Sequence, residues 1–357
     1  MDKKHYIIPI FVPHKGCPHD CIFCNQKKIT GETAEVTAEE VKARIEEYLA
    51  TIPSGGSHIE AAFFGGSFTA TPLGYQKELL EAAFSYVEDG RISSIRISTR
   101  PDCIDAEIAE NLKRYGVGIV ELGVQSMDET VLKLCNRGHT SEDVIESIRL
   151  LKEYGFTVGV QIMIGLPGDS EAKALRTAKE LIDSKPDIAR IYPALVIKNT
   201  YMEDMYIKGE YNPLTLEAAV EISKKLLILF EGNGVKVIRI GLQPTDNINS
   251  GKDVVAGPFH PAFRQLVESL IYREMLAFMI GKSEKKYKTI TVKANPRNIS
   301  ELAGHKKSNL SYIKSRFFID KFVVLQDLSV EADSIVLSAG EDSIIMSKKY
   351  YYSISYK

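Results

Sequence analysis

The chain lacks an excess of charge of either sign, a signal peptide and any long apolar run. Its 357 residues include 45 basic and 47 acidic side chains, a formal net charge of −2 at pH 7. No overall positive field draws it onto nucleic acid, so any such binding must come from a local patch. Residues 1–5 lack the apolar core of a signal peptide, and no apolar run approaches the ~20 residues of a membrane span. These absences predict a cytoplasmic protein without membrane contacts.

Cysteine is also scarce: the chain has five, and three of them fall within eight positions. In a short secreted protein, an even set of spaced cysteines would indicate a disulfide framework. An odd number, crowded in a long chain without a signal peptide, indicates metal or redox chemistry instead.

Short apolar runs alternate with amphipathic helical stretches as far as residue 196. This alternation is typical of βαβ units and a parallel sheet. It predicts an α/β fold with a partial parallel (β/α) barrel, whose active-site loops follow the strands. An open doubly wound sheet has the same local pattern and stays open as an alternative. We expect strands at residues 6–12, 59–64, 94–98, 119–124, 157–164 and 188–196, and helices at 38–50, 75–87, 106–115, 141–154 and 170–184.

The rhythm changes in the second half of the chain. The pattern predicts helices at residues 214–230 and 262–280, with a strand at 235–241 between them. The polar, lysine-rich residues 281–287 suit a linker, and strand-like runs follow at 290–293, 322–325 and 334–337. We therefore expect a core over residues 1–245, a helical extension packed on it over 246–281, and a small α+β C-terminal domain over 282–357.

The three crowded cysteines, Cys17, Cys21 and Cys24, have the spacing C-x3-C-x2-C directly after the first expected strand. Three thiolates on one tight loop can each bind a different iron of a four-iron cluster, which leaves the fourth iron open to an external chelate. A zinc site would need a fourth ligand, which His14 or His19 could supply. The spacing favours the cluster over zinc and over three unrelated structural cysteines.

This triad resembles the signature of the radical SAM superfamily. The resemblance implies a 4Fe-4S cluster whose open iron is chelated by S-adenosylmethionine (SAM). An electron from an external flavodoxin- or ferredoxin-type donor then cleaves SAM and yields a 5′-deoxyadenosyl radical. The cofactor supplies this chemistry, and the protein positions and shields it. The partial barrel is accordingly expected to be of the radical SAM type.

Further motifs match the superfamily at the ends of later expected strands. Gly65, Gly66 and Ser67 resemble its glycine-rich turn, whose backbone contacts the amino group of SAM. Gln125 and Arg137 match a glutamine and an arginine that contact SAM in the oxygen-independent coproporphyrinogen oxidases. A surface ion pair is the alternative for Arg137. Ser98 stands where that family has an acidic SAM contact, so the resemblance assigns its role less directly.

Segments 191–200, 206–211 and 239–243 resemble the catalytic subunit of Elongator, which joins a radical SAM core to an acetyltransferase domain and modifies the wobble uridine of tRNA. The resemblance runs from residue 6 to 243. Tyr192 and Lys198, at and beyond the sixth strand, are expected to line the radical cavity. No glycine-rich pyrophosphate loop follows Gly241, and only sixteen residues precede Cys17. We therefore expect neither acetyl-CoA as a co-substrate nor a long basic extension that would clamp tRNA.

Lys306, Lys307, Lys314 and Arg316 form a local basic cluster around Tyr312. Cations beside an aromatic ring suit contact with RNA phosphates and stacking on bases. A solvated helix face would have the same composition.

Together these features predict a radical SAM enzyme of RNA modification, acting on tRNA. Two alternatives stay open: a tetrapyrrole enzyme like coproporphyrinogen oxidase, and a non-catalytic redox sensor that binds the cluster or SAM. Cys135, beside Leu132 and Leu134, is expected to be a small buried hydrophobic residue.

Overall fold

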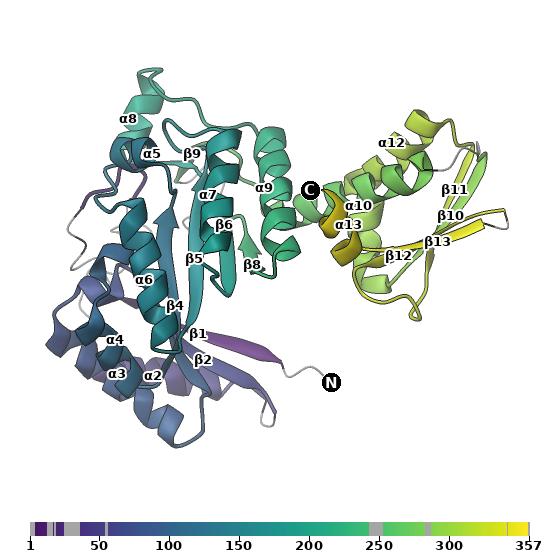
Figure 1. The fold of residues 1–357 in the computed structure, drawn as a ribbon. Coiled ribbons are helices and arrows are strands. Elements are labelled where there is room, and N and C mark those ends of the chain that lie inside the picture. The colour runs from purple at the N-terminus through teal and green to yellow at the C-terminus, as the bar shows by residue number, and fades with distance from the viewer. Residues whose placement is uncertain are drawn as a thin grey trace.

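The larger of the two main sheets contains seven parallel strands that follow one another in chain order, β1-β2-β3-β4-β5-β6-β8 (Figure 1). The computed structural model describes residues 4–12, 17, 19–24, 36–53, 56–242, 253–282, 287–340 and 342–355. A doubly wound sheet reverses its strand order at a switch point, so this order excludes that alternative and confirms the partial barrel. The strands are β1 His5–Val12, β2 His58–Gly65, β3 Ser94–Thr99, β4 Val117–Gln125, β5 Thr157–Ile164, β6 Ile188–Pro193 and β8 Lys236–Ile240.

Helices between the strands cover the outer face of this sheet (Figure 1). Several begin at a side chain that caps the first turn, such as Thr37, which forms a capping box with Glu40, and Thr140, which forms one with Asp143. Such a cap contributes about 1 kcal/mol. The expected helices are confirmed to within two residues at each end, and short α5 and α8 were not predicted. The helices are α2 Ala38–Leu49, α3 Leu73–Glu88, α4 Ala106–Arg114, α5 Glu129–Leu134, α6 Ser141–Glu153, α7 Glu171–Asp183, α8 Tyr201–Ile207 and α9 Leu216–Gly232.

The strand expected over residues 188–196 is too long. β6 ends at Pro193, and Val196–Ile197 form a separate strand, β7, which pairs antiparallel with β9 (Val254–Ala256). Ala194 and Leu195 between them are buried. A buried turn keeps the sequence apolar, so hydrophobicity alone does not mark the end of β6.

A second, four-stranded sheet lies near the C-terminus, in the order β11-β10-β12-β13. Its three expected strands are confirmed, whereas β13 was not predicted. Helix α10 (Phe263–Gly281) contacts α9 on the large-sheet side and α11 and α12 on the other, so it joins the two regions (Figure 1). The other elements are β10 Thr289–Ala294, α11 Ile299–Ala303, α12 Ser308–Phe317, β11 Lys321–Gln326, β12 Ser334–Ala339, β13 Asp342–Ser347 and α13 Lys348–Ser355.

The predicted domain boundaries stay predictions. Position 245 lies outside the described residues, and 281 is the last residue of α10. Within the part of the chain that the structure describes, no helix combines the length and apolar character needed to cross a bilayer.

Candidate active site

The candidate site lies at the edge where the parallel strands of the large sheet end. The cysteine loop, residues 17–24, follows β1, and Val12 at the end of β1 pairs with Gly65 at the end of β2. Arg100 follows β3, and Gln125 is the last residue of β4. Parallel strands share the edge at which they end, so the fold gathers residues that are far apart in the sequence.

The cysteine loop is seated on one short segment, residues 135–138, which we call the docking segment. The backbone N–H of Ile22 donates to the carbonyl oxygen of Cys135 at 3.2 Å. The side-chain amide of Asn136 donates to the carbonyl oxygen of Asp20 at 3.0 Å. One hydrogen bond is donated by the cysteine loop and the other by the docking segment, and together they fix the position of the loop on the segment.

Gly138 completes the docking segment because nothing larger fits there. Its φ angle is +79°, and a Cβ added to it would lie 2.2 Å from Nε2 of His19. The imidazole ring of the cysteine loop thus packs directly on the glycine backbone. His19, which could have completed a zinc site, is packed against the docking segment instead.

Two guanidinium groups point at the cysteine sulfurs. Nη1 of Arg100 lies 3.9 Å from Sγ of Cys17, and Nη1 of Arg137 lies 3.5 Å from Sγ of Cys21. Both arginine side chains are buried. Asp102 forms a two-point ion pair with Arg100. Although burial alone would raise it, this arginine holds the pKa of the Asp102 carboxyl below its usual range.

The donor set fits an iron–sulfur cluster better than a single metal ion. All three thiols are unbridged. One zinc ion with ~2.3 Å bonds would draw its sulfurs to within about 4 Å of one another. Among the described residues, neither the triad nor any trio that includes His19 brings its ligand atoms within 4.8 Å of one another. His14, the other expected zinc ligand, lies outside the described residues. Wider spacing and nearby cations suit thiolates on separate irons.

Gln125 and Arg137, both predicted to bind SAM, converge on Gly123. A Cβ at Gly123 would lie 2.9 Å from both the Gln125 amide nitrogen and Nη2 of Arg137, and Nη2 donates to the Gly123 carbonyl oxygen at 2.6 Å. Gln125 has a φ of +67° and accepts a 2.7 Å hydrogen bond from Gln161. Both side chains are held at the strand edge, and their contact with SAM stays a prediction.

The predicted glycine-rich turn follows β2 at the same edge. Gly65 has a φ of +109°, and the N–H of Gly66 donates to the Val12 carbonyl oxygen at 3.1 Å. That N–H already has a partner, so the turn is braced against the strand that carries the cysteine loop. Ser67 is buried, and Ser98 is half-buried in β3. A SAM contact from any of them stays a prediction.

Tyr192 and Lys198 occupy different settings. Tyr192 lies on β6, half-buried, and its hydroxyl accepts a 3.2 Å hydrogen bond from Arg190. Lys198 is exposed in the turn after β7, where its backbone N–H donates to the Asp253 carbonyl oxygen at 2.9 Å. A role in lining the radical cavity stays a prediction for both residues.

A buried row of charges crosses the inner face of the sheet and was not predicted. Arg96 bonds Glu60 at 2.7 Å and Glu121 at 2.6 Å, and Arg190 bonds Glu121 at 2.8 Å. We call these four side chains the inner row. Each stands between two apolar neighbours in its strand, as in Ile95-Arg96-Ile97. A single charge within an alternating strand was the available signal.

At the opposite end of the strands, His5 and His58 lie 3.2 and 3.0 Å from the Glu60 carboxylate. Within the described part of the chain, these three residues are the group whose metal-ligating atoms come closest together. Arg96 already neutralises this carboxylate, so the histidines are explained as hydrogen-bond partners.

The two remaining cysteines, Cys103 and Cys135, lie in surroundings that disfavour the reactive thiolate form. Cys135 is buried among Ile22, Val131 and Leu166, which confirms the expected hydrophobic role. Burial raises the pKa of the Cys135 thiol to about 12 and that of Cys103 to about 11. Thiols with such pKa values are poor nucleophiles and poor metal ligands.

The predicted basic cluster is divided by the structure. Lys306 and Lys307 are exposed in the turn before α12, while Arg316 donates to the Tyr312 hydroxyl at 3.0 Å. Lys314 is two residues from each of them on the same helix, and at ~100° per residue it faces a different side. The structure therefore brings Arg316 and Tyr312 together and separates Lys314 from them.

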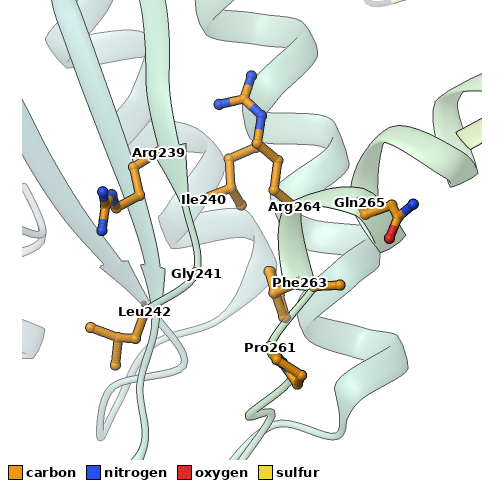
Figure 2. A pocket seen from close by; sticks show the side chains of 9 residues that line it. Arg239, Ile240, Gly241, Leu242, Pro261, Phe263, Arg264 and Gln265 are labelled. Atoms are coloured by element: carbon orange, nitrogen blue, oxygen red, sulfur yellow. The ribbon is translucent and has the colours of Figure 1, made fainter. Parts of the chain in front are cut away.

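A small pocket of about 190 Å³ lies where β8 ends beside the start of α10 (Figure 2). Gly241 permits this approach, since a Cβ there would lie 2.8 Å from the Cβ of Phe263. Figure 2 shows Arg239 and Arg264 pointing in different directions around the pocket. Its volume is below the ~300 Å³ of ordinary ligand sites, so we assign it to packing.

Comparison with known proteins agrees with this geometry. The model of the radical SAM superfamily matches residues 11–181, and that of the Radical_SAM C-terminal domain matches 186–273. An uncharacterized protein of Methanocaldococcus jannaschii is 33% identical over 225 residues, which cover 59% of this chain and 68% of that protein. The chain belongs to the radical SAM superfamily, whose members use a 4Fe-4S cluster and SAM. The predicted family, fold and cofactors are confirmed.

The predicted relation to Elongator is confirmed as well. A tRNA uridine(34) acetyltransferase of M. jannaschii is 34% identical over 257 residues, 60% of this chain and 47% of that protein. The structure of Methanocaldococcus infernus Elp3 with an N-terminal deletion matches with a TM-score of 0.62 and 26% identity, over 76% of this chain and 64% of that one. The chain spans about half the length of the tRNA uridine(34) acetyltransferases that it matches.

Proposed function

We propose that this protein is a radical SAM enzyme that modifies a nucleoside of tRNA. The observation that carries the chemistry is the seated cysteine loop, in which the Cys17 and Cys21 sulfurs each face a buried guanidinium. Support for tRNA comes from the similarity to tRNA uridine(34) acetyltransferases.

In this proposal Cys17, Cys21 and Cys24 hold the cluster, and Gln125 and Arg137 help to hold SAM beside it. A cluster held there would supply one electron, taken from a flavodoxin- or ferredoxin-type donor, for the cleavage of SAM into methionine and a 5′-deoxyadenosyl radical. The chain's own task is to fix these groups and to shield them from water.

Shielding comes from the elements behind the cysteine loop. Ile22 is buried against α5 and the loops after β5 and β6, and its carbonyl oxygen accepts a 2.9 Å hydrogen bond from the N–H of Met202 in α8. Phe23 packs against the same helix. Tyr192, on the inner face of the sheet, is the residue we expect beside the substrate.

The test is anaerobic incubation of the reconstituted, reduced chain with SAM and bulk tRNA, with and without acetyl-CoA. We expect 5′-deoxyadenosine to form and a new nucleoside mass to appear in digested tRNA, whereas a Cys21→Ala variant gives neither. Running both acetyl-CoA arms shows whether the acetyl group is used, independently of SAM cleavage.

Other outcomes identify the alternatives. SAM cleavage with unchanged tRNA, together with a Soret band from bound porphyrin or conversion of coproporphyrinogen, would indicate a tetrapyrrole enzyme. Intact iron uptake without any 5′-deoxyadenosine would leave only the redox sensor.

RNA contact through the turn before α12 has a separate test. Lys306 and Lys307 have φ angles of +49° and +64°, which favour glycine, so Lys→Gly there removes charge without straining the backbone. Lys185, exposed with a φ of +56° beside the large sheet, is a matched control. We expect the Lys306→Gly/Lys307→Gly variant to bind tRNA more weakly with a shallower salt dependence, and Lys185→Gly to bind as the parent does. If both variants bind tRNA equally well, the turn before α12 does not contact tRNA.

A further inference from the structure

Arg100 is the largest of the side chains that are almost completely buried, at 1% exposure. It follows β3 directly, at the edge where the cysteine loop lies. Arg100 is not among the residues expected to contact SAM. It is also not needed to balance the charges of the inner row, which is already neutral. Burial of an arginine is costly unless its charge has partners, so its surroundings indicate what it does there.

Three different parts of the site bind the Arg100 guanidinium. Nε and Nη2 each donate to one oxygen of Asp102 at 2.9 Å. Nη2 also donates to the carbonyl oxygen of Arg137 in the docking segment at 2.6 Å. Nη1, the remaining nitrogen, points at Sγ of Cys17 from 3.9 Å. The fork with Asp102 fixes the plane of the group, and this plane aims Nη1 at the sulfur.

Buried guanidinium groups outnumber the carboxylates bonded to them at this edge. Arg100 and Arg137 both reach cysteine sulfurs, and among the described residues Asp102 bonds Arg100, whereas no carboxylate bonds Arg137. Nε of Arg137 is buried and has no hydrogen-bond partner. Two cations with one counter-charge leave an excess that suits thiolates and would be unfavourable beside neutral thiols.

We propose that Arg100 is a positioning residue that raises the reduction potential of the cluster by holding its positive charge against Cys17. Reduction adds one electron, taken from the external donor, to an already anionic cluster. A buried cation and an N–H aimed at a ligand sulfur both stabilise the added charge. Through its bond to Arg137, the same group ties the cysteine loop to the docking segment. The inference rests on the cluster of the proposed function and is independent of the RNA substrate.

The test is an anaerobic redox titration of the reconstituted full chain, without SAM or RNA, followed by the EPR signal of the reduced cluster. Arg100→Gln removes the charge, and Arg100→Lys keeps it. At a fixed solution potential we expect the Gln variant to show an about ten-fold lower ratio of reduced to oxidised cluster, which is about 59 mV for one electron. We expect the Lys variant to stay within about three-fold of the parent. Arg149→Gln, at an exposed position of α6, is the control and should leave the ratio unchanged.

Every other result has a defined meaning. An Arg100→Gln variant with full iron content and the parent's potential overturns the proposal. If that variant takes up no iron, the Arg100→Lys variant decides between the explanations. Iron uptake with a near-parental potential supports the role of charge. Loss of iron shows that the site needs the shape of the arginine and not its charge, which overturns the proposal. A parent chain that takes up no iron contradicts the proposed function itself, before any arginine variant is compared.

Discussion

Two groups of buried arginines in the large sheet are satisfied in different ways. In the inner row, two arginines meet two glutamates, and Glu121 accepts from both guanidinium groups. At the site edge, Arg100 bonds the Asp102 carboxylate, and Arg137 bonds none among the described residues; their other N–H groups turn towards sulfur and carbonyl oxygen atoms. The inner row is therefore a complete, neutral network that rigidifies the barrel. At the site edge, by contrast, the two guanidinium groups have fewer carboxylate partners than positive charges. Cluster thiolates would supply the missing negative charge.

The difference between the two groups of arginines predicts the largest loss of stability for a substitution in the inner row. Glu121→Gln would leave the buried Arg96 and the half-buried Arg190 with one fewer carboxylate, and breaking a buried pair such as Arg96–Glu121 costs about 3–5 kcal/mol. We expect the urea midpoint of the full chain to fall accordingly. Glu146→Gln breaks an exposed pair with Arg149, which solvent screens, and should lower the midpoint much less. A comparable loss in the two variants would contradict the idea of a neutral buried network.

The second prediction concerns the docking segment. Gly138→Ala would impose a Cβ at a φ of +79° and push it into His19, whereas Gly209→Ala has nearly the same φ, +73°, and nothing within 4 Å. Both share the strain of the left-handed backbone, about 1–3 kcal/mol. We expect only Gly138→Ala to lower iron content after reconstitution, because it alone displaces the cysteine loop.

His19→Ala provides the check on that contact. In its background the added methyl group of Gly138→Ala has room, so much of the lost iron binding should return. If the double variant binds no more iron than Gly138→Ala alone, the cost lies in the backbone and the packing of His19 on the segment is unimportant.

A feature could be predicted from the sequence when the residues that form it are close together along the chain. Cys17, Cys21 and Cys24 lie on one loop, so their spacing favoured a cluster, and its resemblance to the superfamily signature gave the class. Strand and helix positions were predictable because each depends on a periodic run of neighbours. Arg100 was not predicted, because its partners Cys17 and Arg137 are brought to it by the order and register of the strands. Similarly, the inner row exists only once β2, β3 and β4 lie side by side and β6 lies one strand beyond β4, across β5, in a sheet order that a sequence pattern does not specify.

The smallest predicted effect measures the excess charge at the site edge directly. Burial and the nearby guanidinium groups of Arg137 and Arg100 lower the pKa of His139 to about 3. Its folded pKa lies below the unfolded value of about 6.5, so stability is complete above pH 6.5 and is lost as the pH falls towards 3.

Between pH 7 and pH 5 this histidine alone should cost the unloaded chain about 2 kcal/mol. A His139→Gln variant should lose that much less stability over the same interval, whatever it loses at pH 7. Arg100→Gln should also flatten the slope, because removing one cation makes protonation of His139 less unfavourable. A parental slope in Arg100→Gln would mean that burial and Arg137 lower the pKa of His139 without a contribution from Arg100.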